Sequence, residues 1–135
     1  MNAQAKRDRL IDSAAELFHQ YGLSTTSLAD IAKHAEIPIG NVYYYFKTKE
    51  ELAVAAVEKR RYQFKAAFET LNDTFPNPRQ RLIEALQYFD KVSEEYTKYG
   101  CPIGRIIEDA DMEKDIVAHA AAEVFHDFIN WPRQK

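Results

Sequence analysis

Apolar residues recur at helical spacing along most of the chain, and Gly, Pro and polar segments interrupt the pattern. The first run predicts a helix over 3–21, closed by Gly22 as a left-handed C-terminal cap. No run of alternating β-branched residues is present, so the pattern indicates an all-α fold. The apolar positions expected to form one buried stripe in the first helix are Leu10, Ile11, Ala14, Leu17, Phe18 and Tyr21.

Two short helices are predicted next. Ser27 and Asp30 have the spacing of a capping box that opens a helix over 28–35. Pro38 suits the first position of a helix over 38–45, because the amide that it lacks would be unpaired there. Two helices joined by so short a turn predict a helix-turn-helix, with a plain αα-hairpin of a helical bundle as the alternative.

Longer helices account for the rest of the chain. Thr48 and Glu51 form a second capping box before a helix that reaches about residue 71. The segments 72–78 and 100–102 carry Pro, Gly and Asn and predict breaks. Between and after these breaks, helices are expected over 79–99, 103–110 and 112–131. The stripe expected to be buried in the first of these three consists of Leu82, Ala85, Leu86, Phe89, Val92 and Tyr96.

The bulk charge is weakly acidic but unevenly distributed. The 135 residues carry a formal net charge of −3. Residues 1–60 hold eight Lys and Arg against eight Asp and Glu, so the acidic excess lies in the second part. Because charges act within about a Debye length, ~8 Å at physiological salt, the net charge does not exclude a nucleic-acid partner. No segment is apolar enough for a signal peptide or a membrane span, and a cytoplasmic protein is expected.

Three segments resemble one known family. LIDSAAELFHQYG, TTSLADIAKHA and GNVYYYFKTKEEL, within residues 6–58, are similar to the N-terminal domain of TetR/AcrR bacterial transcriptional regulators. The resemblance implies a homodimer whose third helices enter successive major grooves of a palindromic double-stranded DNA operator. It also implies a helix-turn-helix DNA-binding domain over 1–47. A helical bundle for effector binding and dimerisation would occupy 48–135.

The family motif assigns DNA-binding roles by position. Tyr45 either lies near a phosphate or packs inward. Lys6, Arg7 and Lys33 either contact phosphates or form a solvated face. Glu36 stands where the family usually has Gly, and Ile39 makes the start of the recognition helix apolar. The residues expected at the DNA are Thr25, Thr26, Lys33, Ile39, Gly40, Asn41, Tyr43, Tyr44, Tyr45 and Lys47.

The second part of the chain is rich in aromatic residues. Most of them would be core residues in any helical bundle, but the resemblance implies that some enclose a small hydrophobic or aromatic effector that releases a repressor from its operator. We expect no cofactor. The effector residues expected on this basis are Tyr62, Phe68, Tyr88, Phe89 and Tyr96.

Two further features are weaker. Cys101 is alone and is expected to be a small buried residue, with a redox role as the alternative. Asp115, His119, Glu123 and His126 share one helix face, where a solvated polar stripe is favoured over a metal site. The chain is also shorter than members of the family, and the last dimerisation helix is expected to be absent, which predicts a weaker dimer.

Other classes of protein remain as alternatives. The sequence has no Ser/His/Asp or Cys/His arrangement, no phosphate-binding Gly-rich loop and no HExxH spacing, so an enzyme is not expected. A helical DNA-binding module without effector control would bind DNA regardless of ligand. A helical adaptor would show no salt-dependent affinity for DNA.

Overall fold

The computed structural model describes residues 2–109 and 116–131. All regular structure in these two segments is helical. The helices are α1 (Ala3–Tyr21), α2 (Leu28–Ala35), α3 (Ile39–Tyr45), α4 (Lys49–Thr74), α5 (Pro78–Lys91), α6 (Ser93–Tyr99), α7 (Pro102–Ile107) and α8 (Ile116–Asn130). The predicted all-α fold is confirmed.

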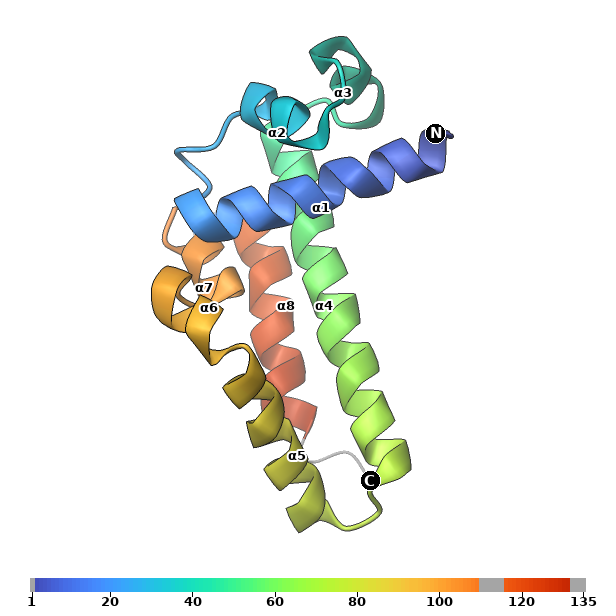
Figure 1. Ribbon diagram of the computed structural model, residues 1–135, viewed down its shortest axis with the longest axis vertical. Coiled ribbons are helices and arrows are strands. Elements are labelled where there is room, and N and C mark those ends of the chain that lie inside the picture. Colours follow the sequence, from blue (N-terminus) through green and yellow to red (C-terminus); the bar gives the residue numbers. More distant parts are fainter. Residues whose placement is uncertain (1, 110–115, 132–135) are drawn as a thin grey trace.

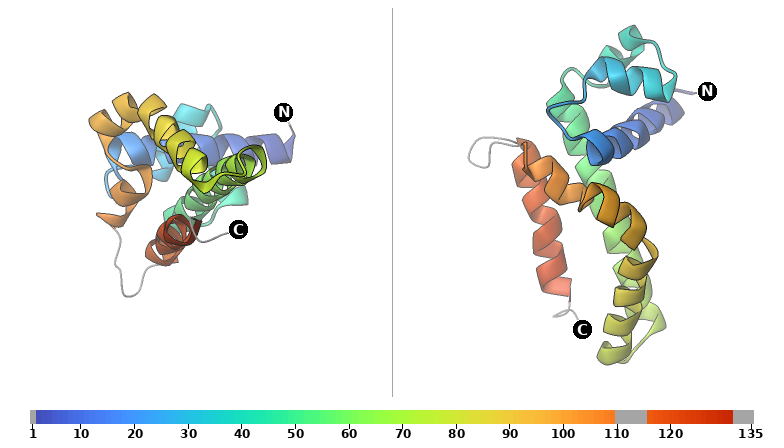
Figure 2. Two further views of the ribbon diagram at one scale, coloured as in Figure 1. Left: turned by 90° about the horizontal axis from the view of Figure 1, so that it is seen from below. Right: turned by 60° about the vertical axis from the view of Figure 1, so that its left-hand side comes forward.

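Helix α4 connects the two ends of the molecule. Its first turns pack under α1, with α2 and α3 at the same end, and its remaining turns lie beside α8 (Figure 1). Helices α5, α6 and α7 lead back from the far end of α4 to the end of α1 (Figure 2). The chain therefore forms a head of α1–α3 on the start of α4, with a bundle of α4–α8 beneath it.

The head contains the best-packed part of the core. Leu10, Phe18, Ile31, Val42 and Leu52 have no exposed surface and come from all four of its helices. Removing such side chains from water is the main term that holds small helices together, because helices of this length are marginal on their own.

Local signals set the ends of the head's helices. Ser27 and Asp30 form the predicted capping box, each side chain accepting from the other's backbone amide. The Thr48 hydroxyl accepts from the Glu51 amide at 3.1 Å, as expected. Gly22 ends α1 with φ 93°, a value that favours glycine, although its ψ of 164° lies outside the left-handed helical region.

Several boundary predictions were wrong. Pro38 is the N-cap of α3 rather than its first residue. The helix predicted over 79–99 is two helices, because Val92 has φ −100° and ψ 5° and leaves helical geometry there. Helix α4 continues to Thr74, beyond the predicted end at 71. Helix α7 ends at Ile107, and the predicted start of the last helix, at 112, lies outside the described residues.

The predicted stripes failed at specific positions. Tyr21 is exposed at the end of α1, and Cys101 is exposed at the N-cap of α7 instead of buried. On α5, Ala85 alone of the predicted stripe is buried. The other stripe members on α5 have few neighbours, since α5 contacts mainly α4 and α6. Val92 lies between α5 and α6, and Tyr96 lies on α6. The exposed members are Leu82, Leu86 and Phe89.

No helix among the described residues is long and apolar enough to cross a membrane.

Candidate nucleic-acid interface

The turn between α2 and α3 has the geometry of a helix-turn-helix. Glu36 takes a left-handed conformation with φ 58° and ψ 42°, in the place where the family usually has Gly. The Ile37 amide then donates to the Ala32 carbonyl at 2.9 Å, which ends α2. A non-glycine residue in this region is strained by about 1 kcal/mol, so contacts around Glu36 must hold the turn.

Helix α3 presents its aromatic residues to solvent. Val42 is fully buried, while Tyr44 is 76% exposed and Tyr43 is also exposed. Tyr45 is half-buried against the core, as the alternative for it predicted, and its ring meets the Tyr44 ring edge-on at a centroid distance of 4.9 Å. The exposed side of α3 is therefore amphipathic, with apolar ring faces and phenolic hydroxyls available to a partner.

The start of α3 is open. Ile39 is exposed, and Asn41 is half-buried. A Cβ atom placed on Gly40 would meet no atom within 4 Å. The protein itself thus leaves room beside Gly40, which is the arrangement that a close approach to a DNA backbone requires.

Lysines border α3 on its C-terminal side. Lys47 Nζ donates to the Tyr43 carbonyl at 3.0 Å, and the Lys47 amide donates to Glu51 Oε2 at 2.9 Å. Lys49, which sequence reasoning missed, donates from Nζ to the Leu23 carbonyl at 2.9 Å and so ties the start of α4 to the loop after α1. The first turn of α4 carries two acids, Glu50 and Glu51, close to Lys47, which is one of the residues expected at the DNA.

The two threonines before α2 differ. Thr26 is 3% exposed, and its hydroxyl donates to the Gly22 carbonyl at 2.8 Å. The expected phosphate contact through the Thr26 side chain is therefore corrected: in this structure it is a packing residue of the turn. Thr25 is exposed, with its hydroxyl bonded to the Tyr21 carbonyl, and Lys33 lines the same surface hollow.

Two arginines of α1 contact residues that flank α3, one in the turn before it and one at its C-cap. Arg9 Nη2 donates to Glu36 Oε2 at 2.9 Å, and the Arg7 guanidinium lies 5.2 Å from the centroid of the Phe46 ring. Sequence reasoning treated Arg7 as a solvated or phosphate-contacting residue and gave Arg9 no role. Glu36 was the available signal, because an acid in this turn can pair with a base of a neighbouring helix, although 80% of its side chain stays exposed.

Aromatic residues of the bundle gather between α4, α5 and α8. Phe68 stacks on Trp131 with centroids 4.6 Å apart and an interplanar angle of 26°. Phe64, Phe68 and Phe89 each contact the ring of Phe128, at centroid distances between 5.2 and 6.1 Å. Phe64, Phe68, Phe89, Phe128 and Trp131 are called the aromatic cluster below.

The structure does not bring the five predicted effector residues together. Phe68 and Phe89 belong to the aromatic cluster, and Tyr88 lies beside Phe89 at a centroid distance of 5.7 Å. Tyr62 is 74% exposed on α4, which contradicts its assignment to an enclosed site. Tyr96 lies instead against His19 under the head, where burial raises its pKa to about 12.

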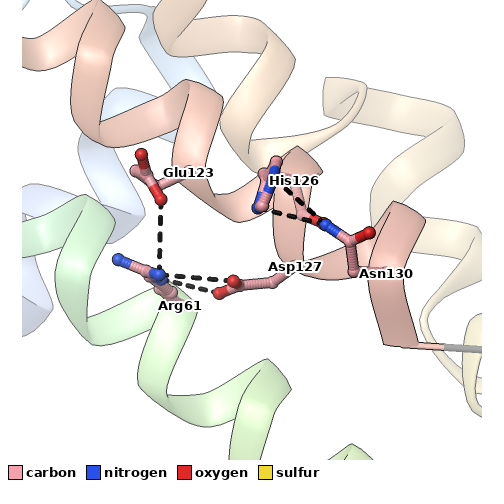
Figure 3. A network of polar contacts seen from close by, with 5 residues as sticks. All are labelled: Arg61, Glu123, His126, Asp127 and Asn130. Carbon is pink, nitrogen blue, oxygen red and sulfur yellow. Dashed lines mark hydrogen bonds and ion pairs between the residues drawn. The ribbon is translucent and has the colours of Figure 1, made fainter. Parts of the chain in front are cut away.

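Polar contacts join α4 to α8 beside the aromatic cluster (Figure 3). Arg61 makes a bidentate pair with Asp127, at 2.6 and 3.2 Å, and also faces Glu123 at 3.5 Å. The Arg61 guanidinium lowers the pKa of Asp127 below its ordinary value. His126 bonds to Asn130 on its own helix.

Part of the polar stripe predicted on the last helix contacts α4. Glu123 is directed to Arg61, and no group of three metal-ligating side chains is found among residues 2–109 and 116–131. The polar stripe that was favoured over a metal site thus contributes to ion pairs between α4 and α8. Asp115, its first member, lies outside the described residues.

A buried histidine joins the head to the bundle. His19 of α1 is 1% exposed, and its Nε2 lies 2.7 Å from the Gly100 carbonyl after α6. Its Nδ1 faces Glu95 Oε1 at 3.3 Å. Nearby, the Ser24 amide donates to Asp109 Oδ2 at 3.0 Å, and this bond lowers the pKa of Asp109.

The architecture is thus a helix-turn-helix with an exposed, aromatic second helix, placed on a helical bundle. Known proteins share parts of it. Residues 10–56 match the family described as bacterial regulatory proteins, tetR family. Over these residues the chain is similar to this family.

Relatives and solved structures extend this similarity over more of the chain. The transcriptional repressor DhaR of Mycobacterium sp. (strain GP1) is 26% identical over 130 residues, which are 96% of this chain and 64% of the relative. A TetR-family transcriptional regulator from Agrobacterium tumefaciens superposes with a TM-score of 0.85 over 96% of this chain and 68% of that one, at 20% identity. The SmeT–triclosan complex matches with a TM-score of 0.72 and 27% identity, over 95% of this chain and 62% of that one.

The chain is shorter than the proteins that it resembles. It spans 64% of DhaR and 23% of the AcrR regulator of Shigella flexneri, which is 46% identical over 50 residues. Those 50 residues are 37% of this chain.

Proposed function

We propose that this protein is a sequence-specific DNA-binding transcriptional regulator, most simply a repressor, which reads a palindromic operator with α3. Residues 1–47 are the proposed DNA-binding domain, and residues 48–135 are the proposed regulatory domain. Helix α4 packs against both α1 and α8, so a shift in the bundle would move the head.

The observation that carries the proposal is the exposure of Tyr43 and Tyr44 on a short helix after a helix-turn-helix turn. A side chain as large as Tyr44, at 76% exposure, contributes little to the core. Its hydroxyl suits a phosphate oxygen or a base edge, and its ring suits a thymine methyl group. An α-helix with such side chains fits the major groove.

The surrounding residues support phosphate contacts. Thr25, Lys33, Asn41 and Lys47 lie at exposed or half-buried positions in α2, in α3 or at their edges. Lys47 would exchange its bond to the Tyr43 carbonyl for a phosphate oxygen. Gly40 leaves the backbone of α3 free to approach the sugar–phosphate chain, and Ile39 would meet a base edge.

Selection from a pool of random duplexes tests the proposal. The wild-type protein is expected to enrich an inverted repeat, and Tyr44→Ala is expected to lose at least roughly tenfold in affinity for it. Tyr62→Ala is the matched control, because Tyr62 is 74% exposed on α4, away from α3. Equal losses in both variants, or no enrichment by folded wild-type protein, would contradict the proposal and favour a helical adaptor.

A homodimer is part of the proposal. Ile116, Phe125 and Ile129 are exposed on α8, and Leu82 and Leu86 are exposed on α5. Exposed apolar residues concentrated on two helices mark an association surface. Sedimentation of the wild type is expected to show a concentration-dependent dimer, which Ile129→Lys weakens and Tyr62→Lys does not. A monomer at high concentration would exclude this surface as the interface.

A small hydrophobic or aromatic effector is proposed to bind at the aromatic cluster. A hollow there is lined by Phe64, Phe68, Phe128 and Trp131 and bordered by Arg61 and Asp127. The related SmeT has been solved as a complex with triclosan. Triclosan is thus a first probe: it should raise the melting temperature of the wild type and weaken its binding to the enriched duplex.

The site itself is tested with Phe128→Ala, because Phe128 lines the hollow. This substitution should reduce both effects of triclosan, whereas Tyr62→Ala should leave them intact. A panel of apolar aromatic compounds that never changes DNA affinity would favour the alternative, a DNA-binding module without effector control.

A further inference from the structure

The recognition helix α3 has few contacts of its own. It is seven residues long, its N-cap Pro38 offers no side-chain hydrogen bond, and Val42 is its single fully buried side chain. A helix of this length is unstable without tertiary contacts, because the first turn fixes several residues for one hydrogen bond. Beyond the burial of Val42, its position therefore depends on contacts of the residues that flank it.

The residues at both ends are contacted by the same helix, α1. On the N-terminal side, Arg9 Nη2 donates to Glu36 Oε2 at 2.9 Å. On the C-terminal side, the Arg7 guanidinium lies over the ring of Phe46, the C-cap of α3, at 5.2 Å. Phe46 is buried, so its ring is a fixed support for the arginine.

The contact to Glu36 has both a geometric and an electrostatic consequence. Glu36 is the residue with positive φ in the turn, and its backbone amide bonds to the carbonyl of Lys33. A partner for its side chain favours that strained turn over alternatives. An unpaired carboxylate one turn before α3 would also oppose the approach of phosphates, and Arg9 neutralises it.

We propose that Arg7 and Arg9 are positioning residues, which hold the recognition helix between them and are not themselves phosphate contacts. The proposal rests on the proposed function in one respect, that α3 is the DNA-reading element. The proposal goes beyond the proposed function because it gives Arg7 and Arg9 a role other than binding DNA phosphates.

Hydrogen exchange of the intact chain tests the positioning without DNA. Arg9→Gln and Arg7→Gln are expected to speed exchange of the amides in 37–46 by roughly threefold to tenfold, with α4 and α8 unchanged. Lys6→Gln is the matched control, since it removes one positive charge from the same turn region of α1. Unchanged exchange of 37–46 in both arginine variants would overturn the proposal.

The salt dependence of DNA binding separates positioning from phosphate contact. The probe is the duplex enriched by the wild type, titrated between about 50 and 200 mM salt. We expect Arg9→Gln to lower affinity roughly threefold to tenfold at each salt concentration, with an unchanged slope of log affinity against log salt. Glu36→Gln added to Arg9→Gln should restore part of the loss, because it removes the unpaired acid.

Direct phosphate contacts by the two arginines would give a different result. If each arginine held a phosphate, the slope would become shallower by about 0.9 per variant, and Glu36→Gln would restore nothing. If the wild type enriches no duplex, the proposed function fails. The exchange measurement still decides whether the two arginines position α3.

Discussion

The head and the α5–α6 segment contrast in how completely they are packed. In the head, α1, α2 and α4 each bury several side chains, and α3 is seated by Val42. In α5, Ala85 is buried while Leu86 is 68% exposed. An apolar stripe on a helix can pack into the core of its own chain or against a partner molecule. The contrast teaches that helical periodicity alone does not distinguish these two cases.

Core truncation should show the largest difference between the two regions. Phe18→Ala is expected to lower the free energy of unfolding by about 3–5 kcal/mol, because it removes a fully buried ring from the head. Leu86→Ala is expected to change it by less than about 0.5 kcal/mol in the monomer. Urea denaturation of both variants checks this, and equal losses would contradict the contrast.

The junction between the regions should come next. His19→Ala is expected to cost about 1–3 kcal/mol, because it leaves the Gly100 carbonyl without its buried donor and opens a gap beside Tyr96. His34→Ala, at a half-exposed position on α2, is the control and should be nearly neutral. The same denaturation experiment measures both, and a neutral His19→Ala would show that the junction is loose in solution.

Helix caps should separate the regions by a smaller amount. Ser27→Ala removes the capping box of α2 and is expected to cost about 1 kcal/mol. Ser93→Ala at the start of α6 should cost little, since α6 has no side-chain cap to lose. If circular dichroism at increasing temperature shows similar shifts for the two variants, capping does not distinguish the head from the bundle.

Acid should weaken the contact between α4 and α8 and the contact between the head and the end of α7 slightly. The Arg61 guanidinium lowers the pKa of Asp127 below 3.8, and the Ser24 amide lowers the pKa of Asp109 below 3.8. For a depressed carboxyl pKa, the stabilisation is complete above the unfolded value and is lost as pH falls through the folded value. Urea midpoints should therefore fall as pH drops below about 3.9, and by less in Asp127→Asn.

Glycine substitution gives the smallest effect on stability and a separate effect on DNA. Gly40→Ala is expected to raise the free energy of unfolding by up to about 0.5–1 kcal/mol, since a Cβ meets nothing there and α3 gains helix propensity. It should nevertheless weaken binding to the enriched duplex. Gly104→Ala, in α7, should leave DNA binding unchanged, and its Cβ would have ordinary contact with Cys101.

Sequence predicted the head more accurately than the bundle, for physical reasons. The bounds of α1 and α2 match the prediction because local signals set them: Gly22 with positive φ, and the capping box of Ser27. The break between α5 and α6 at Val92 was not predicted, because no Gly or Pro lies there. The exposure of Tyr62 and Leu86 depends on which neighbours α4 and α5 have, and periodicity does not encode the neighbours.

The candidate site was predicted unevenly for the same reason. The family motif identifies positions, so Tyr43, Tyr44 and Lys47 were found as candidates on or beside α3. Whether a hydroxyl is free depends on the folded turn, and Thr26 uses its own within the protein. The contact of Arg9 with Glu36 spans 27 residues of sequence and required the fold to be seen.

The central claim is that α3 and its borders are the DNA-binding surface. The most direct test is amide NMR of the labelled protein titrated with its enriched duplex, or with a mixed-sequence duplex at low salt if none is enriched. We expect the largest shift changes in residues 39–47 and at Thr25, with α5 among the least affected elements. The largest changes on α5 or α8, or none at low salt, would contradict the account.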